Sequence, residues 1–241
     1  MNEPVLRFAE VDKVFGEGAS SALALRGINF TVNAGEFTAL IGSPGSGKSS
    51  MLAVGGGLDQ PTNGEVFVNN TSLGGLGLNE SASLRRRFIG YLHQKPDLVP
   101  MLTVLENVAL PRELDGAPTE VAHGEAETAL DKIGIADLSG RSARVLSGAE
   151  QQRVALARAV VGDRRLVLAD EPTAALGSAD GDELLDSLRH LADEGFAVLL
   201  TTQETRQTAW ADRVLFINDG QIIGESGSRF GSELVFADRY V

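Results

Sequence analysis

The segment that most constrains the fold of this chain is Gly42-Ser-Pro-Gly-Ser-Gly47-Lys48-Ser49, which fits the pattern G-x-x-x-x-G-K-[ST]. Such a loop needs glycines, because its backbone N–H groups wrap around phosphate oxygens with no Cβ in the way. Lys48 then supplies a positive charge to the phosphates, and the Ser49 hydroxyl is a ligand for Mg²⁺. The residues predicted to bind phosphate are Gly42, Ser43, Pro44, Gly45, Ser46, Gly47, Lys48, Ser49 and Ser50.

The surroundings of this loop support the prediction. The short apolar run 37–41 precedes it and reads as a buried strand, while a helix-compatible stretch follows it. A second apolar run, Leu166-Val-Leu-Ala169, ends in Asp170-Glu171. Acids at the carboxyl end of a parallel strand lie where open α/β sheets bind ligands. Asp170 is therefore predicted to hold Mg²⁺ in its outer shell, and Glu171 to act as the general base that polarises the attacking water.

Strand and helix patterns alternate along the chain, which predicts an α/β fold with a mostly parallel sheet. Strands are expected at 5–11, 28–32, 37–41, 65–68, 166–169 and 196–201, and a hairpin at 214–223 around Asn218-Asp219-Gly220. Helices are expected at 103–110, 119–133, 151–161 and 180–193. No clear strand lies in 96–144, so this stretch is predicted to be a helical insert, and 74–79 is predicted to be a loop.

Composition limits the remaining possibilities. With 241 residues, 43% of them hydrophobic, the chain can bury one sizeable core, and residues 1–241 are predicted to form a single domain. The absence of cysteine excludes disulfides, thiolate zinc sites, iron–sulfur clusters and cysteine nucleophiles.

The charge balance argues against a nucleic-acid partner. The chain has 21 Lys and Arg against 33 Asp and Glu, a formal net charge of −12, which repels phosphate backbones and anionic lipid. The one basic run, 85–87, is interpreted as a solvated helix face. No apolar stretch reaches the ~18 residues of a membrane span. The first residues lack the apolar region of a secretion signal, so a cytoplasmic location is expected.

Four further motifs extend these observations. Gln94 ends the segment IGYLHQ, and Leu146-Ser147-Gly148-Ala149-Glu150 precedes QQRVALARA; Pro172-Thr173 follow Glu171, and Phe15 stands in DKVF. In this order and spacing the motifs resemble the ATP-binding cassette (ABC) ATPases over essentially the whole chain. The resemblance implies a P-loop core with a mostly parallel sheet, an antiparallel β-subdomain and a helical subdomain at about 91–145.

The resemblance also implies cofactors and roles. ATP and Mg²⁺ are expected, with Phe15 stacked on adenine. Family members function as dimers, in which each ATP lies between one subunit's phosphate loop and the other's signature motif, here Ser147, Gly148 and Ala149. The implied metal site comprises Ser49, Gln94 and Asp170. The implied catalytic residues are Glu171, Gln94 and Gln203.

Two segments narrow the branch of the family. RRRFIGYLHQKPDLVPMLTVLENVALP and RLVLADEPTAALGS are similar to the lipoprotein-release and macrolide-export branch. Members of that branch drive permeases that act on substrates at the outer face of the membrane. The resemblance therefore implies a transmembrane permease partner and a peripheral position on the cytoplasmic face of the cell membrane.

Several positions depart from the family pattern. Ala149 replaces the second signature glycine, Glu150 replaces the common glutamine, and Gly177 stands where the D-loop aspartate is usual. Gln203 stands where a histidine that contacts the γ-phosphate is expected. Removing one transition-state donor typically costs ~10²–10³ in rate. Of the three histidines, His93 adjoins Gln94 and is interpreted as a packed loop residue rather than a replacement; the others, His123 and His190, are expected on helix surfaces.

Three functions remain open from the sequence. The leading one is an ATP-hydrolysing subunit of a membrane transporter. The second is a nucleotide-binding regulatory subunit with little ATPase activity, which Gly177 and Gln203 favour. The third, an ABC protein of DNA repair or translation, is disfavoured by the acidic charge and by the single cassette. A heterodimer with an intact second cassette is preferred over a homodimer, which would carry the Gln203 defect in both sites.

Overall fold

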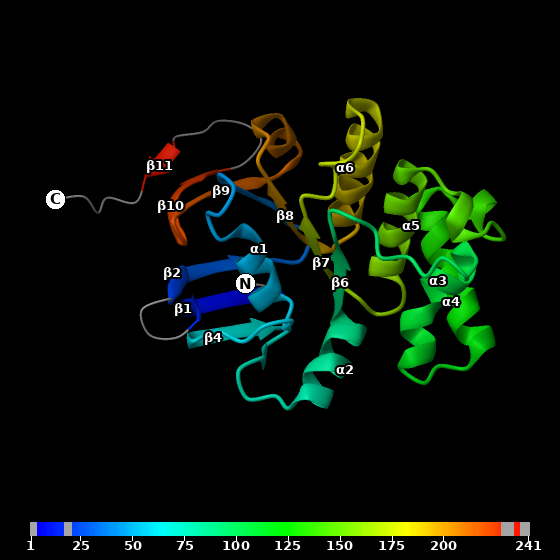
Figure 1. The fold of residues 1–241 in the computed structure, drawn as a ribbon, viewed down its shortest axis with the longest axis horizontal. Coiled ribbons are helices and arrows are strands. Elements are labelled where there is room, and N and C mark those ends of the chain that lie inside the picture. Colours follow the sequence, from blue (N-terminus) through cyan, green and yellow to red (C-terminus); the bar gives the residue numbers. More distant parts are fainter. Residues whose placement is uncertain (1–3, 17–20, 228–233, 237–241) are drawn as a thin grey trace.

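A seven-stranded sheet forms the centre of the protein, for which a computed structural model describes residues 4–16, 21–227 and 234–236. The strand order is β11-β10-β9-β3-β8-β7-β6 (Figure 1). Neighbouring strands from β9 to β6 are parallel, whereas β10 and β11 are antiparallel additions at one edge. The bounds are β3 Phe37–Ile41, β6 Ile89–Leu92, β7 Leu166–Asp170, β8 Ala197–Thr202, β9 Arg213–Asn218, β10 Gln221–Ser226 and β11 Leu234–Phe236. The predicted fold class is confirmed.

Successive residues of the central strands are buried on opposite faces of this sheet. On β7, Leu166 and Leu168 pack into one apolar cluster, whereas Val167 and Ala169 pack into a second cluster on the other face. All four side chains are fully buried. Burial on both faces explains why these strands read as continuous apolar runs in the sequence.

One face of the central sheet is covered by a second, antiparallel sheet and by helix α1. The second sheet has the order β2-β1-β4-β5, with β1 Leu6–Phe15, β2 Ala22–Val32, β4 Asn63–Val68 and β5 Thr71–Ser72. Helix α1, Lys48–Gly55, places Met51, Leu52 and Val54 in the apolar cluster between the sheets. The phosphate loop therefore enters a helix whose position is fixed by a fully buried apolar face.

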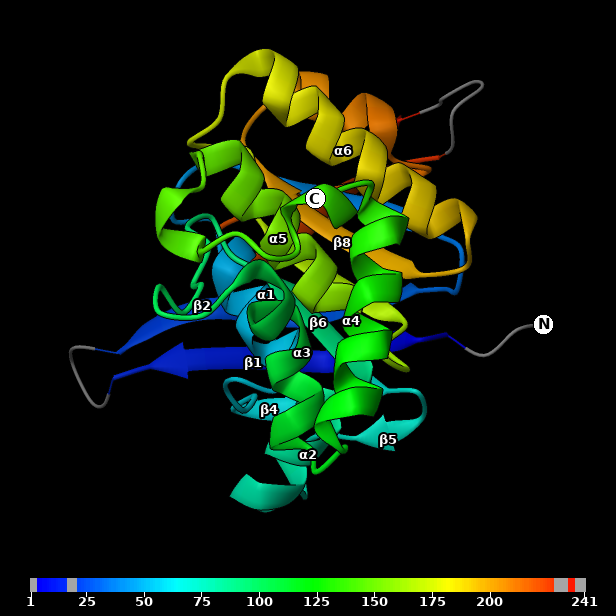
Figure 2. The same cartoon turned by 90° about the vertical axis from the view of Figure 1, so that its right-hand side faces the viewer.

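The other face is covered by helices α5 and α6, and a helical segment extends beyond them (Figures 1 and 2). The helices on this face and in the helical segment are α3 Val104–Leu114, α4 Thr119–Ile133, η2 Ala136–Leu138, η3 Ala143–Val145, α5 Gly148–Val160 and α6 Ser178–Asp193. Helices α3 and α4 lie side by side in both views. Thr103 caps α3 by accepting a hydrogen bond from Glu106 N, whose carboxylate accepts one in return from Thr103 N.

The structure differs from the sequence prediction near residue 78. Helix α2 spans Leu78–Phe88, so the predicted loop 74–79 ends inside it. Glu80 accepts a hydrogen bond from Gly77 N at 2.9 Å, and the helix starts one residue before the loop is expected to end. The basic run lies in the last turn of α2, where positive charge is favourable. It is not simply a solvated face, because Arg85 donates to Gly57 O.

Other boundaries shift by a few residues. Strands β1 and β2 extend well beyond the predicted 5–11 and 28–32, because they pair along their length with register shifts that the sequence pattern conceals. Tyr91 belongs to β6, so the helical segment begins after Leu92 rather than at residue 91. In the part of the chain that the structure describes, no helix has the length and apolar character needed to cross a membrane. The predictions for residues 1–3 and for the end of the domain lie outside the described residues.

Candidate functional site

The phosphate loop connects β3 to α1, and two of its glycines, Gly42 and Gly47, lie where a side chain would clash with neighbouring backbone. A Cβ on Gly42 would lie 2.4 Å from Ile217 O, and a Cβ on Gly47 would lie 2.6 Å from Ala24 O. Gly45 and Gly47 adopt left-handed backbone conformations, with φ of 80° and 106°. Gly47 is also the N-cap of α1, so the loop delivers the N-terminus of that helix to the site.

Lys48 is the first residue of α1 and its side chain is 4% exposed. Its Nζ donates to the carbonyl oxygens of Gly42, at 2.7 Å, and Ser43, at 3.1 Å. Its third near neighbour is Glu171 Oε1, at 3.3 Å. The Lys48 ammonium group is thus bound by its own loop and by one acid.

Ser49 and Asp170 form the hard-oxygen part of the site. Ser49 Oγ donates to Asp170 Oδ1 at 3.2 Å, although β3 and β7 are separated by more than a hundred residues of sequence. Thr201, at the end of β8, donates to the same carboxylate oxygen at 2.7 Å and so fixes its orientation. A hydroxyl oxygen and a carboxylate oxygen in contact are ligand atoms that suit Mg²⁺. Among the residues described, no group of three or more His, Cys, Asp or Glu side chains is arranged to hold a metal ion.

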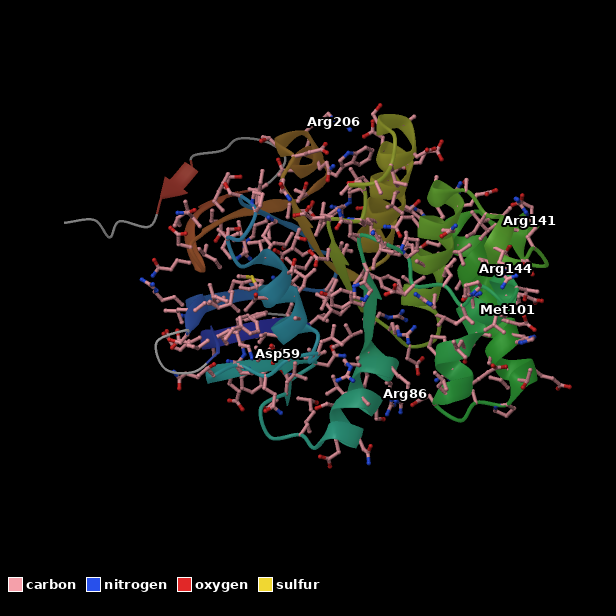
Figure 3. All side chains as sticks on the ribbon, in the orientation of Figure 1. Asp59, Arg86, Met101, Arg141, Arg144 and Arg206 are labelled. Atoms are coloured by element: carbon pink, nitrogen blue, oxygen red, sulfur yellow. The ribbon has the colours of Figure 1, made fainter. Side chains whose placement is uncertain are left out.

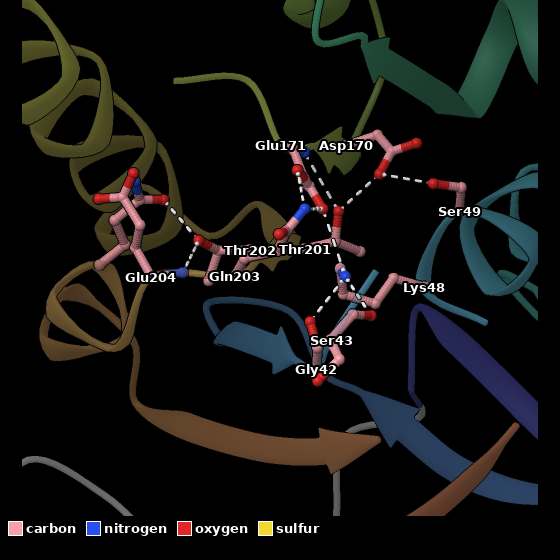
Figure 4. A network of polar contacts seen from close by, with 11 residues as sticks. Gly42, Ser43, Lys48, Ser49, Asp170, Glu171, Thr201, Thr202, Gln203 and Glu204 are labelled. Carbon is pink, nitrogen blue, oxygen red and sulfur yellow. Dashed lines mark hydrogen bonds and ion pairs between the residues drawn. The ribbon is translucent and has the colours of Figure 1, made fainter. Parts of the chain in front are cut away.

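Glu171 follows β7 in a conformation that is unusual for a residue with a side chain, with φ of 44°. Its N–H donates to Thr201 O and Oγ1, both at 3.1 Å, which holds the strained backbone in place. Gln203 Nε2 contacts both carboxylate oxygens of Glu171 at 2.8 Å (Figure 4). The residue in the expected histidine position therefore holds the carboxylate predicted to be the base.

These residues line one pocket of about 330 Å³. It is lined by Ala24, Pro44, Gly45, Gly47, Lys48, Ser49, Ser50, Gln94, Asp170, Glu171 and Gln203. Gly42, Ser43 and Ser46 complete the loop behind it, and the Ser46 side chain is buried. Ala24, on β2, was missed in the sequence, because a small residue on a distant strand belongs to no motif.

Two groups of predicted binding residues lie outside this pocket. Phe15, at the end of β1, is 43% exposed, and its ring lies 4.9 Å from Lys13 Nζ rather than in the pocket lining. Ser147, Gly148 and Ala149 form the start of α5 and do not line the pocket either. A single chain therefore brings the phosphate loop, Gln94 and the acids together, but not the aromatic ring or the signature residues.

The signature end of α5 has its own hydrogen-bonded structure. Ser147 Oγ accepts from Glu150 N at 3.2 Å, and Glu150 Oε2 accepts from Ser147 N at 2.7 Å. Arg141 donates to Glu150 Oε1 at 2.7 Å. The hydrogen bond from Ser147 N is the main reason that the pKa of Glu150 is lowered, and Arg141 adds to it. Glu150, one of the departures from the family pattern, thus completes a capping box.

None of the three histidines lines the pocket. His93 stacks on Tyr91 with ring centroids 4.3 Å apart, as expected of a packed loop residue. His123 is half-buried on α4, 3.7 Å from Glu113, and His190 is exposed on α6, 3.2 Å from Glu194. Burial, and then the charge of Asp170, raise the pKa of the Tyr91 hydroxyl, which stays protonated at neutral pH.

Comparison with known proteins places this geometry in context. The ABC transporter family model matches residues 25–174. The pyoverdine export ATP-binding/permease protein PvdT of Pseudomonas fluorescens is 38% identical over 229 residues, 95% of this chain and 35% of that protein. The macrolide export ATP-binding/permease protein MacB 1/2 of Paracoccus denitrificans is 38% identical over 222 residues, 92% of this chain and 33% of that protein. The chain thus spans about a third of the length of these relatives.

A solved structure shares the fold over nearly its whole length. The dimeric ATP-binding cassette MJ0796, in a post-hydrolysis state bound to ADP and Pi, superposes with a TM-score of 0.83 and 33% sequence identity. The match covers 94% of this chain and 99% of that one.

Proposed function

This chain belongs to the ABC transporter family as an ATP-binding domain, and from that premise we propose that it binds and hydrolyses Mg–ATP to drive a transmembrane permease that exports or extracts a substrate. One observation carries the proposal: Lys48, Ser49, Asp170 and Glu171 converge on one pocket behind a loop that accepts only glycine at two positions. In this proposal residues 1–241 are one cassette domain, with a helical subdomain at about 91–145.

The chemistry follows from the charges in the pocket. A bound triphosphate competes with the Gly42 and Ser43 carbonyls for the Lys48 ammonium, and the N–H groups at the start of α1 face the same phosphate oxygens. Glu171 Oε1 then loses its lysine neighbour and can accept a proton from a water in line with the γ-phosphate. Gln203 donates to both oxygens of this carboxylate and so competes with that proton for the carboxylate lone pairs.

Mg²⁺ fits the pair Ser49 and Asp170, and Gln94 lines the same pocket. When bound, the ion neutralises charge that develops on the phosphate oxygens. The chain's own part is to orient the ligands: Thr201 holds the Asp170 carboxylate, and α1 holds the Ser49 hydroxyl.

The pocket is half of the proposed catalytic site. The signature residues Ser147, Gly148 and Ala149 are exposed or half-buried at the start of α5. In the proposed dimer they face the ATP of a second cassette, while the partner's signature residues close the Lys48 pocket. A heterodimer is favoured over a homodimer, since Gln203 in both sites would remove a charged donor from both.

A groove of about 300 Å³ on another side of the molecule suits the permease. It lies between the end of α1, strand β6 and the end of α3, and its lining combines exposed leucines with several arginines. Leu58 is 52% exposed and Leu114 is 66% exposed. Burial lowers the pKa of Arg164 to about 10, so it stays charged at neutral pH. The cationic groups are Arg85, Arg86, Arg158 and Arg164 (Arg86 is labelled in Figure 3).

We propose that an apolar cytoplasmic helix of the permease bearing a carboxylate docks in this groove. Leu114→Glu should abolish co-purification with the permease, because it places an anion where the apolar helix would lie. Val121→Glu is the matched control, since Val121 is 48% exposed on α4 and does not line the groove. Equal permease recovery with both variants would contradict the docking site.

Nucleotide binding is the test of the whole proposal. Lys48→Ala should weaken the affinity for a fluorescent ATP analogue with Mg²⁺ by about 100-fold, because it removes the charge that the phosphates meet. Lys132→Ala is the control, since Lys132 is a charged residue of α4 paired with Glu194 and remote from the pocket lining. If Lys48→Ala binds the analogue as tightly as the parent, the proposed nucleotide site is wrong.

A second candidate function rests on Gln203. Because this amide occupies both oxygens of Glu171, the chain could bind ATP and change the dimer without hydrolysing it at its own site. Single-turnover measurement with a partner cassette that cannot hydrolyse ATP separates the two candidates. With either function, the chain is proposed to work on the cytoplasmic face of the membrane, bound to its permease.

A further inference from the structure

Gln152 lies in α5 and its side chain reaches three backbone carbonyls at once. Its Nε2 atom is 2.6 Å from Pro172 O, 2.9 Å from His93 O and 3.4 Å from Gln94 O. The residue is 1% exposed. Three carbonyl oxygens around one atom require that atom to be the donor nitrogen of the amide, because an oxygen there would be repelled by all three.

The arrangement is not that of an ordinary satisfied core glutamine. The amide has two N–H groups for three acceptors, so the longest contact, to Gln94 O, is the weakest. The other end of the amide, Oε1, is buried, and the described residues offer it no hydrogen-bond partner. A buried polar atom left in this way calls for an explanation, since most such atoms in folded proteins are paired.

The three carbonyls belong to two segments that contribute residues to the pocket beside the phosphate loop. Gln94 follows β6, and its side chain lines the pocket. Pro172 follows Glu171, and it has no N–H, so its carbonyl is the only backbone group through which this residue can be held. The N–H of Glu171 donates to Thr201, and the carbonyl of the following residue, Pro172, accepts from Gln152.

The same helix begins at the signature residues. Ser147 caps α5, and Gln152 is five residues further along the same rigid element. A displacement of Gln94 toward a bound γ-phosphate would therefore change the partners of Gln152, and α5 would shift with them. Gln152 has three acceptors for two N–H groups, so after such a displacement its amide could exchange one acceptor for another and lose no hydrogen bond. A structural element that can exchange partners in this way can adopt two arrangements.

We propose that Gln152 is a positioning residue that couples this chain's own nucleotide to its signature end. It holds the loops of Gln94 and Glu171 in a fixed position relative to α5. ATP in the Lys48 pocket therefore changes how Ser147 is presented to the ATP of the second cassette. The coupling rests on the proposed function, because it requires that ATP binds at Lys48 and that the signature end serves a partner site.

The first test uses the purified chain without nucleotide and measures amide hydrogen exchange by mass spectrometry. Gln152→Met keeps the length of the side chain and removes its donor. We expect exchange in 93–97 and 173–176 to accelerate by about 10-fold, the factor given by one lost hydrogen bond. Gln151→Met is the matched control: Gln151 is the neighbouring glutamine, and its amide donates to a single carbonyl, Leu146 O. Unchanged exchange in both loops would overturn the proposal.

The second test adds Mg²⁺ and a non-hydrolysable ATP analogue to the same proteins. In the parent and in Gln151→Met, the analogue should change exchange at 146–151 by several-fold, although these residues do not line the pocket. In Gln152→Met that remote change should be lost while the affinity for the analogue changes less than about threefold. A response at 146–151 that persists in Gln152→Met would overturn the coupling.

Two further variants guard against a folding defect. Gln152→Lys restores a donor among three carbonyls and should recover the remote response; Gln152→Glu can donate only when protonated, so its response should grow as the pH falls from 8 to 6. A response absent at every pH in both variants, in proteins with the parent's melting temperature, would count against the coupling. If the parent fails to bind the analogue, the proposed function fails, and the nucleotide-free exchange measurement still decides whether Gln152 holds the two loops.

Discussion

The nucleotide pocket and the signature end of α5 are both made of short polar motifs, but they are organised differently. In the pocket, residues from helix α1 and from the ends of strands β7 and β8 bond to one another: Asp170 accepts from Ser49 and Thr201, and Glu171 from Gln203 (Figure 4). At the signature end the contacts are local, since Ser147 and Glu150 cap each other within one turn.

This difference indicates what each region can do. Long-range hydrogen bonds position several side chains around one ligand, as a complete half-site for phosphate and metal requires. A locally capped helix N-terminus presents its first residues outward, which suits a ligand held by another chain. Substitutions in the two regions should therefore affect different nucleotides of the proposed dimer, and the following predictions test that separation.

The largest expected effect is at the signature end. Ser147→Arg should reduce the ATPase rate of the whole complex by more than about 100-fold, because a bulky cation displaces the γ-phosphate of the partner's nucleotide. Binding of a fluorescent ATP analogue to the isolated chain should be unchanged, since Ser147 does not line this pocket. Thr128→Arg, on the exposed face of α4, is the control and should leave both values intact. Weakened binding by the isolated Ser147→Arg chain would show that the two regions are not separate.

Next in size is the effect of Gln203 in the pocket. Gln203→His should raise single-turnover hydrolysis at this site by about 10- to 100-fold in a complex whose partner cassette is inactive, because imidazole adds a donor for the γ-phosphate and frees Glu171. The measurement is release of phosphate from pre-bound ATP. No increase, with unchanged ATP affinity, would mean that the Gln203 contact with Glu171 does not limit this site.

The difference between the regions also explains what the sequence could predict. The loop Gly42–Ser49 and the acids after β7 follow local patterns, because a strand, a turn and a helix are adjacent in sequence, and the structure brings them into one pocket. The sequence also predicts that these buried strands belong to a mostly parallel sheet, but their order, β3–β8–β7, is known only from the structure. The roles of the individual site residues remain predictions.

Contacts between distant segments were not predictable in this way. Ala24 enters the pocket because the β1–β2 pairing brings it there, and an alanine has no pattern of its own. The start of α2 depends on one carboxylate that caps Gly77 N, within a stretch rich in glycine. The contacts of Gln152 have no signal in the sequence, because its amide donates to carbonyls about twenty and sixty positions away.

A smaller effect is expected from Glu171→Gln in this chain. If the heterodimer is correct, the partner's cassette carries most of the turnover, and the substitution here should lower the ATPase rate of the complex by about twofold or less. The matching substitution in the partner should abolish turnover. Complete loss from Glu171→Gln alone, or two copies of this chain in the purified complex, would rule out the asymmetric dimer.

The smallest effect concerns pH and the capping box at the signature end. The hydrogen bond from Ser147 N keeps the pKa of Glu150 below its ordinary value of 4.5 in the folded chain. A carboxyl group with a lowered folded pKa stabilises the protein fully above its unfolded pKa, and that stabilisation is lost as the pH falls through the folded pKa. Glu150→Gln should therefore lower the melting temperature at pH 7 by about 2 °C or less, because the pair with Arg141 is exposed. As the pH falls through this lowered pKa, the difference from the parent should shrink toward zero.

Helix α3 offers the matched comparison, because Glu106 caps Thr103 in the same way and the hydrogen bond from Thr103 N also lowers its pKa. Glu106→Gln should give the same pH dependence of the melting temperature. Only Glu150→Gln should also alter the ATPase rate of the complex, since only the capping box of α5 contains residues proposed to face a nucleotide. If the Glu150→Gln difference in melting temperature stays constant between pH 7 and pH 3, the ionised carboxylate does not stabilise α5. If Glu106→Gln changes the ATPase rate equally, capping at the signature end acts through overall stability and not through the partner's ATP.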